Sequence, residues 1–242
     1  MPGLRARGVL PGLTTRSEAS AGARRGPTGP QAPLYVLTGE RGAGKSTVCA
    51  RVAQEAARLG LAVAGILTER SHSAEPGAAR TVTDLRTGES RPFGFQDRRP
   101  EPTNPHTAGD VRSPVDNAAT LTGATAAPVD ATVASDPLTP GWRFDSEVFA
   151  WANQALAGSV PCDLLVVDEI GPLELHGGRG WAGALEVLSA TGYRAALVVC
   201  RPELIAQLQK RLSPHSLEIF EVTPETRDLL PGAIIARLSA CR

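Results

Sequence analysis

Apolar residues follow two alternating patterns along most of the chain. Short apolar runs predict buried β-strands, and longer stretches with apolar residues three or four positions apart predict helices. The expected strands are Leu34–Thr38, Ala62–Thr68, Leu164–Asp168, Ala195–Cys200 and Leu217–Glu221. The expected helices are Ser46–Leu59, Ser146–Ala157, Gly180–Thr191, Pro202–Leu212 and Pro224–Ala240, the last broken near Pro231-Gly232. Strands that alternate with helices are typical of βαβ units, so we expect an α/β fold with a mostly parallel central sheet.

One stretch between these units has a different pattern. Residues Thr81–Leu85 and Ser90–Phe93 have the character of two short strands, and Arg86–Glu89 between them has the composition of a turn. The arrangement predicts a small β-hairpin in addition to the parallel sheet.

Two segments contain too little apolar surface to form a core. Residues 1–32 are rich in Arg, Gly, Ala and Pro, and residues 96–140 are dominated by Pro, Thr, Ala, Asp and Asn and have no aromatic residue. In such segments the conformational entropy of the chain outweighs burial. We therefore expect a disordered leader (or a misassigned start codon) at 1–32, and a domain at 33–240 that contains a disordered, low-complexity insertion at 96–140.

The length, charge and composition of the chain narrow the range of possible functions. The chain has 242 residues, which suits one ordinary α/β domain, and 25 basic and 25 acidic residues give a formal net charge of zero. This balance gives no electrostatic reason to expect nucleic acid or an anionic membrane as a partner.

No apolar run approaches the ~18 residues that span a bilayer, and the N-terminus has no signal-peptide core, so we expect a cytoplasmic protein. The four cysteines and four histidines are dispersed, which disfavours disulfides and a zinc site.

Residues 39–47 carry the clearest chemical motif. Their sequence, Gly-Glu-Arg-Gly-Ala-Gly-Lys-Ser-Thr, fits the phosphate-loop (Walker A) pattern G-x-x-x-x-G-K-[ST] and lies between an expected strand and an expected helix. In that setting backbone N–H groups and a helix N-terminus converge on one anion. The expected nucleotide-binding residues are Gly39, Glu40, Arg41, Gly42, Ala43, Gly44, Lys45, Ser46 and Thr47.

Within this loop, two side chains have specific expected roles. Lys45 is expected to reach the β- and γ-phosphates, and the Ser46 hydroxyl is expected to bind Mg²⁺. The chain has 23 arginines but only two lysines, Lys45 and Lys210. Lysine therefore stands where a compact, flexible ammonium is needed, although most basic positions are arginine.

A second motif follows about 120 residues later. The four apolar residues Leu164–Val167 end in the two carboxylates of Asp168 and Glu169. In phosphate-loop enzymes such a strand (Walker B) brings an acid beside Mg²⁺, and we assign Asp168 to that position. Glu169 is then the expected general base, which positions the water that attacks the γ-phosphate.

The segment around these acids resembles a known family. Residues 167–175, Val-Asp-Glu-Ile-Gly-Pro-Leu-Glu-Leu, are similar to the D-E-I-G-P-[ML]-E-L signature of the THEP1-type nucleoside-triphosphatases, a small family of P-loop NTPases. Gly65–Glu69, Trp142–Asp145 and Glu221–Asp228 resemble further segments of this family. The resemblance covers roughly residues 34–238 apart from the insertion.

The resemblance implies a fold and an activity. The fold is the three-layer sandwich of P-loop NTPases, and the activity is Mg²⁺-dependent hydrolysis of ATP, GTP and other nucleoside triphosphates to the diphosphate and phosphate, with loose base selectivity. The long 96–140 segment and residues 176–179 depart from the family pattern, but neither departure touches the phosphate or metal groups.

Several assignments remain open from the sequence. An arginine that stabilises the transition state could be Arg41, Arg70, Arg179 or Arg201, and Arg201 could instead contact the base or ribose. Glu69 and Glu174 could support the site or be ordinary loop carboxylates. The aromatic residues Trp142, Phe144, Trp151 and Trp181 could anchor the core, or some of them could stack on a base.

Two other functions suit the same scaffold. A nucleotide or small-molecule kinase would transfer the phosphoryl group to an acceptor instead of water, although a second acid at position 169 favours hydrolysis. A nucleotide-dependent switch or assembly factor would hydrolyse slowly and act through an unknown protein partner.

Overall fold

The computed structural model describes residues 32–70, 78–96, 133–135 and 137–240. These residues belong to one compact unit, Ala32–Arg242. The predicted leader, apart from Ala32, and most of the predicted insertion lie outside the described residues. Both therefore stay predictions.

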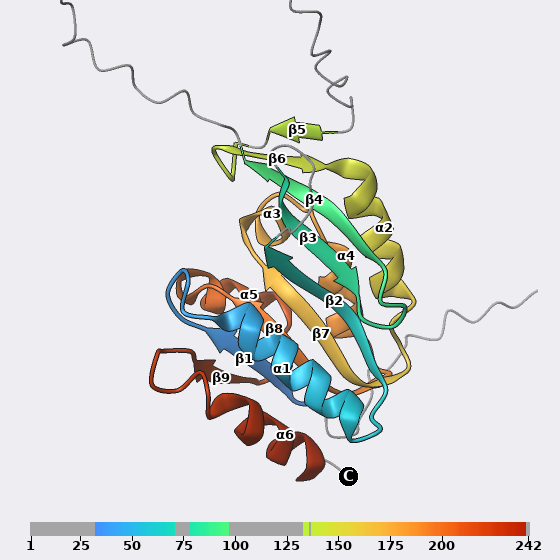
Figure 1. The fold of residues 1–242 in the computed structure, drawn as a ribbon, viewed down its shortest axis with the longest axis vertical. Helices are drawn as coiled ribbons and strands as arrows, with labels where there is room; N and C mark the ends of the chain where they lie inside the picture. Colours follow the sequence, from blue (N-terminus) through green and yellow to red (C-terminus); the bar gives the residue numbers. More distant parts are fainter. Residues whose placement is uncertain (1–31, 71–77, 97–132, 136, 241–242) are drawn as a thin grey trace, which may run out of the picture. The chain divides into compact units, whose positions relative to one another are not determined.

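The described strands form a single nine-stranded sheet with the order β5-β6-β4-β3-β2-β7-β8-β1-β9 (Figure 1). Their bounds are β1 (Leu34–Thr38), β2 (Val63–Arg70), β3 (Ala78–Asp84), β4 (Ser90–Gln96), β5 (Val133–Ser135), β6 (Trp142–Asp145), β7 (Cys162–Ile170), β8 (Tyr193–Cys200) and β9 (Leu217–Glu221). The five strands from β2 to β9 in this order are mutually parallel, and the other four extend the sheet by antiparallel pairing. The parallel core confirms the predicted α/β class.

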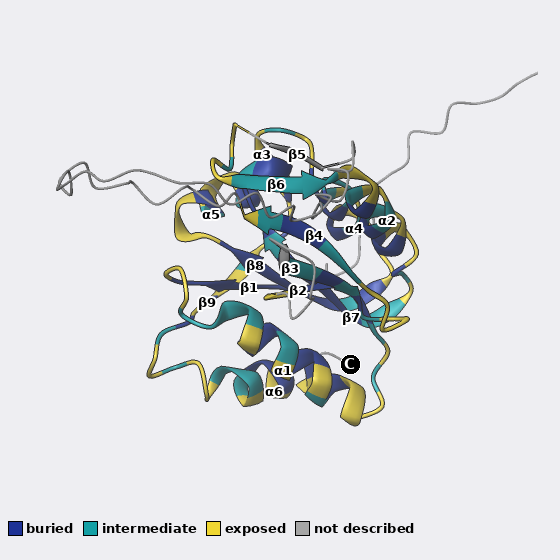
Figure 2. Ribbon diagram, turned by 45° about the horizontal axis from the view of Figure 1, so that its top comes forward, coloured by how far each residue is buried: buried dark blue, intermediate teal, exposed yellow. Residues whose placement is uncertain are grey.

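Helices cover both faces of the sheet (Figure 2). Their bounds are α1 (Lys45–Arg58), α2 (Ser146–Ala157), α3 (Pro172–Leu175), α4 (Gly183–Ser189), the 3₁₀ turn η1 (Pro202–Leu204), α5 (Ile205–Arg211) and α6 (Leu230–Ala240). Helices α1 and α6 pack together on one face, and α2, α4 and α5 lie on the other. This arrangement is the three-layer sandwich that the family resemblance implied. Among the described residues, no helix has the length and hydrophobicity that a bilayer crossing requires.

The continuous apolar runs in the sequence follow from burial on both faces of the sheet. In β1, Leu34 and Val36 pack into the core on the α2 side, whereas Tyr35 and Leu37 pack into the core on the α1 side. A strand that is covered on both faces has no polar face, so its sequence does not alternate.

The predicted hairpin is confirmed as β3 and β4, but it is part of the main sheet. Strand β3 pairs with β2, and β4 pairs with β6. The sequence did not predict β6 as a strand, because four residues are too few for a clear period. Residues 133–135, inside the predicted insertion, form the edge strand β5 against β6, so the expectation of a structureless segment is wrong at that point.

Two differences concern helices. The last helix begins at Leu230, and Pro231 lies in its first turn, where the missing N–H costs no hydrogen bond. The sequence predicted a helix that breaks near this proline, but the helix begins there instead. The residues from Pro224 to Leu229 form turns. The single-turn helix α3 was not predicted, because one turn gives no measurable period.

The aromatic residues whose role the sequence left open lie on the α2 side of the sheet. Phe144 and Trp151 pack against the core on this face, and Trp142 stacks on Phe144 with ring centroids 6.3 Å apart. Trp181 is buried and meets Phe93 edge to face at 4.8 Å. The packing interpretation is confirmed for Phe144, Trp151 and Trp181.

Candidate functional site

The predicted site residues meet at the carboxyl edge of the parallel strands. Leu37 of β1 pairs with Val199 of β8, and Cys200 of β8 pairs with Ile170 of β7. The loops that follow these strands therefore leave the sheet side by side. In open α/β sheets, ligands bind at this edge.

The phosphate loop connects β1 to α1. Gly39, Gly42 and Gly44 have positive φ angles of 134°, 85° and 101°. At Gly39 a Cβ atom would lie 2.5 Å from the Val222 carbonyl oxygen, so only glycine fits between the loop and the segment after β9. The loop itself is exposed at Glu40, Arg41 and Gly42, whereas Ala43 and Gly44 are half-buried.

The side chain of Lys45 lies over the loop. Its Nζ donates to the carbonyl oxygens of Gly39 and Glu40, at 2.7 Å in both cases. Lys45 is also the first residue of α1. The ammonium group is thus held at the same place as the free N–H groups of the helix N-terminus, which concentrates positive charge there.

The loop and the predicted metal-binding acid are in direct contact. Ser46 Oγ donates to Asp168 Oδ1 at 3.2 Å, although the two residues are 122 positions apart in the sequence. The other oxygen of Asp168 accepts from both the backbone N–H and the hydroxyl of Thr68, at 3.2 Å each. Thr47 is exposed, which leaves Ser46 as the hydroxyl that faces the acid. Sequence reasoning gave Thr68 no role, although it lies in the Gly65–Glu69 segment that resembles the family and near the end of the strand beside β7.

Asp168 is fully buried. Its surroundings together raise its pKa to about 6: burial raises the pKa most, the charge of Glu169 also raises it, and the hydrogen bonds from Thr68 and Ser46 lower it. Among the described residues, the partners of Asp168 are hydroxyl and amide groups, and it forms no ion pair. A cation bound beside this carboxylate would favour its ionised form.

Glu169 points to a different partner from Asp168. The register between β7 and β8 is irregular between Val167 and Ile170, and a local irregularity of this kind re-aims side chains. Glu169 Oε1 accepts from Arg201 Nε at 2.8 Å, and the peptide bond between Asp168 and Glu169 is cis. The Glu169 carbonyl oxygen accepts from the indole N–H of Trp181 at 3.0 Å. The residue is therefore held at its backbone and at its side chain.

Glu174 is a buried carboxylate that supports the segment after β7. It accepts from the backbone N–H groups of Gly171 and Trp181, at 2.9 and 3.0 Å. Its surroundings together raise its pKa to about 7: burial raises the pKa most, these hydrogen bonds lower it, and the charge of Glu169 raises it. Of the two interpretations left open for Glu174, the supporting one fits this position. Glu69, by contrast, is exposed at the end of β2.

The four candidate arginines occupy different surroundings. Arg201 contacts Glu169, as described above. Arg41 is exposed within the phosphate loop, Arg70 is exposed at the end of β2, and Arg179 is exposed between α3 and α4. A fifth arginine, Arg227, lies against the phosphate loop, where its Cδ would be 3.8 Å from a Cβ on Gly44.

The donor set at this edge suits magnesium better than zinc. The described residues contain no group of three or more His, Cys, Asp or Glu side chains that could hold a metal by themselves. A hydroxyl and one carboxylate are hard oxygen donors, and Mg²⁺ is usually held by one or two such protein groups together with water and substrate phosphates. Ser46 and Asp168 fit this pattern.

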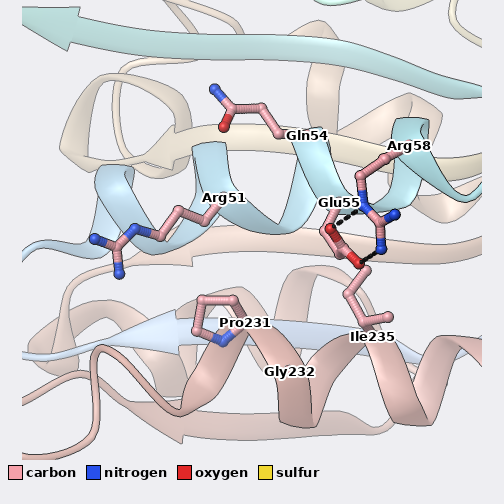
Figure 3. Close-up of a pocket in the computed structure, with 7 residues that line it drawn as sticks. All are labelled: Arg51, Gln54, Glu55, Arg58, Pro231, Gly232 and Ile235. Atoms are coloured by element: carbon pink, nitrogen blue, oxygen red, sulfur yellow. Dashed lines mark hydrogen bonds and ion pairs between the residues drawn. The ribbon is translucent and has the colours of Figure 1, made fainter.

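A hollow lies elsewhere, between α1 and α6 (Figure 3). It has a volume of about 510 Å³, and its walls include Arg51, Glu55 and Arg58 from α1 and Ile235 from α6. Arg58 is hydrogen-bonded to Glu55, and Arg51 is paired with Asp228. The hollow contains none of the predicted site residues. We therefore identify the candidate site from the chemistry of its residues, and it does not coincide with this hollow.

Comparison with known proteins shows the family to which the chain belongs. The sequence model of the NTPase family matches residues 34–117 and 147–235. The chain belongs to this family. It is 26% identical over 208 residues to the "Nucleoside-triphosphatase THEP1" of Methanosarcina barkeri, which covers 85% of this chain and 97% of the relative. The resemblance to the THEP1-type nucleoside-triphosphatases is thereby confirmed, and with it the expected enzyme class.

Two solved structures share the fold of this NTPase. The solution structure of a human cancer-related nucleoside triphosphatase has a TM-score of 0.57 and 21% identity, and covers 87% of this chain and 100% of its own. The crystal structure of THEP1 from the hyperthermophile Aquifex aeolicus has a TM-score of 0.53 and 17% identity, and covers 85% and 98%. At these identities the two structures support the P-loop NTPase fold.

Proposed function

We propose that this NTPase hydrolyses the γ-phosphate of nucleoside triphosphates, with Mg²⁺ as its cofactor. The observation that carries the proposal is the contact between Ser46 of the phosphate loop and Asp168 at the end of β7. Two motifs far apart in sequence meet there, and the meeting point has the composition of a magnesium-nucleotide site. Glu169 lies next to it, at the same edge of the sheet.

The phosphate loop binds the triphosphate. The N–H groups of residues 39–47 and the N-terminus of α1 face the phosphates, and the Lys45 ammonium neutralises the β- and γ-phosphates. The contacts of Lys45 with two loop carbonyls support this role, because they place the ammonium inside the loop. Binding and reaction require little rearrangement of these groups, because the fold has already oriented them.

Ser46 and Asp168 would hold the metal ion. Their donor chemistry fits Mg²⁺, and Thr68 fixes the orientation of the Asp168 carboxylate through two hydrogen bonds. When bound, the ion neutralises the negative charge of the β- and γ-phosphate oxygens.

Glu169 is the general base of the hydrolytic step. A water oxygen attacks the γ-phosphorus, the bond between this phosphorus and the β–γ bridging oxygen breaks, and the carboxylate accepts a proton of the water. The products are the nucleoside diphosphate and phosphate. Every proposed contact is with the phosphates, the metal ion or the attacking water. These groups are the same for ATP, GTP, CTP and UTP, which differ only in their bases. This supports broad base selectivity that includes ATP and GTP.

Phosphate release tests the proposal directly. Purified protein is assayed with ATP, GTP, CTP and UTP, in Mg²⁺ and in EDTA. We expect hydrolysis of all four nucleotides that EDTA abolishes. Glu169→Gln should bind nucleotide but lose about 100-fold or more in kcat, because a general base contributes about 10²–10⁴.

The matched control is Glu186→Gln, which changes an exposed carboxylate on α4. It should hydrolyse at the parental rate. Parental hydrolysis by Glu169→Gln would show that another group activates the water. Formation of diphosphate only in the presence of an added acceptor would identify a kinase instead.

A further inference from the structure

The ion pair between Arg201 and Glu169 connects two neighbouring strands at the site. Arg201 directly follows β8, and Glu169 is the penultimate residue of β7. Arg201 Nε lies 2.8 Å from Glu169 Oε1. The arginine side chain is 48% exposed and the glutamate side chain 30% exposed. The pair is therefore partly shielded from water but open to a ligand.

The pair is one of two interactions that hold Glu169. The indole of Trp181 holds its carbonyl oxygen, and Trp181 is in turn held by Glu174 through its backbone N–H. Trp181 thus fixes the backbone of Glu169, whereas Arg201 fixes the orientation of its side chain.

Other charged groups surround the pair, and none of them replaces Arg201. Asp168 and Glu174 are acids that face Glu169 from β7 and α3, and Glu203 of η1 acts on Arg201. Arg201 is the only cation paired with Glu169 among the described residues. Without it, no ion pair among the described residues would balance the charge of the Glu169 carboxylate.

We propose that Arg201 is a positioning residue, which holds the Glu169 carboxylate in the orientation that accepts the proton of the attacking water. The proposal rests on the function assigned above to Glu169. It gives Arg201 a role in the chemical step and none in nucleotide affinity. A general base must lie within hydrogen-bond reach of its proton, and a displacement of about 1 Å can cost about 100-fold in rate.

The test compares kcat with nucleotide affinity in Arg201→Ala, Arg201→Lys, Glu169→Gln and the double variant. Affinity for ATP with Mg²⁺ is measured by titration calorimetry, and thermal unfolding checks that each variant is folded. Arg201→Ala should lose about 10- to 100-fold in kcat and change the Kd by less than about threefold. Arg201→Lys should recover part of the lost rate, because it restores one donor and the charge.

The double-mutant comparison isolates the proposed mechanism. In the Glu169→Gln background, Arg201→Ala should lower kcat by no more than about twofold, because the side chain that it positions is already gone. Arg58→Ala is the matched control, since it removes an arginine from an Arg–Glu pair on α1 outside the site, and it should leave kcat and Kd unchanged.

Three results would overturn the role of Arg201 while leaving Glu169 as the base. They are a parental or higher kcat in Arg201→Ala, a loss that lies in Kd instead of kcat, and an undiminished effect in the Glu169→Gln background. Parental hydrolysis by Glu169→Gln alone would overturn the proposed function itself. The two failures are therefore distinguishable.

Discussion

Two carboxylates near the end of β7 are buried, and the protein satisfies them differently. Asp168 accepts hydrogen bonds from two side-chain hydroxyls and one backbone amide. Glu174 accepts from two backbone amides. The hydroxyl of Ser46 can turn toward a ligand, whereas the backbone amides around Glu174 are fixed by the fold. The first environment suits a group that binds a ligand, and the second suits a group that holds a loop in place.

The raised pKa of Glu174 makes a prediction about stability and pH. Its pKa is about 7 in the folded protein and near the ordinary value of 4.5 in the unfolded chain. The folded state therefore binds the proton more tightly. The stability contributed by protonation is fully present below about pH 4.5, is lost as the pH rises toward 7, and changes little above that. At about 1.4 kcal/mol per pKa unit, the total change is about 3 kcal/mol at most.

Glu174→Gln should remove this part of the pH dependence. We expect the difference in free energy of unfolding between the parent and the variant to shift by up to about 3 kcal/mol in favour of the variant between pH 4.5 and 7. Urea unfolding across this range measures it, with Glu186→Gln as the exposed control. If the curves of the parent and Glu174→Gln run parallel, Glu174 does not carry the predicted shift.

At the scale of elements, the site depends on how closely β2 and β7 approach each other. Gly65 of β2 is in register with Val166 of β7 and has a φ of 108°. A Cβ at this position would lie 2.0 Å from the Val166 carbonyl oxygen. The absence of a side chain therefore lets the two strands pair. That pairing carries Thr68, three residues further along β2, to Asp168.

Gly65→Ala should separate these strands and destabilise the protein. We expect a loss of about 3 kcal/mol or more in the free energy of unfolding, because steric overlap with backbone atoms adds to the cost of a positive φ. Gly60→Ala is the matched control. Gly60 also has a positive φ of 80°, but no atom lies within 4 Å of its Cβ position, so it should lose only about 1 kcal/mol. Equal losses in the two variants would show that the close approach of β2 to β7 is unimportant.

At the scale of the whole molecule, the sequence predicted the parts of the fold that have strong local signals. Leu34–Thr38 and Leu164–Val167 are continuous apolar runs because both strands are covered on both faces. In a parallel sheet the carboxyl ends of strands lie at one edge, so Ser46 and Asp168 could be expected to meet there. The contact between them agrees with that expectation.

Features that depend on register or on very short elements were not predictable. The pairing of Glu169 with Arg201 depends on the irregular register between β7 and β8, which leaves no trace in composition or period. Strand β6 and helix α3 each have four residues, fewer than either period needs. The support that Glu174 gives to Trp181 depends on a loop conformation, and loop conformation is set by tertiary contacts.

The central claim is that residues 39–47 and Lys45 bind a magnesium-bound nucleoside triphosphate. Titration calorimetry with ATP and GTP in the presence of Mg²⁺ tests it most directly, and the chain provides its own control in its two lysines. We expect a Kd of roughly 1–100 μM for the parent and for Lys210→Ala, whose exposed lysine lies on α5. Lys45→Ala should bind at least about tenfold more weakly. Equal affinity of Lys45→Ala and Lys210→Ala, or no heat of binding with any triphosphate, would contradict the claim.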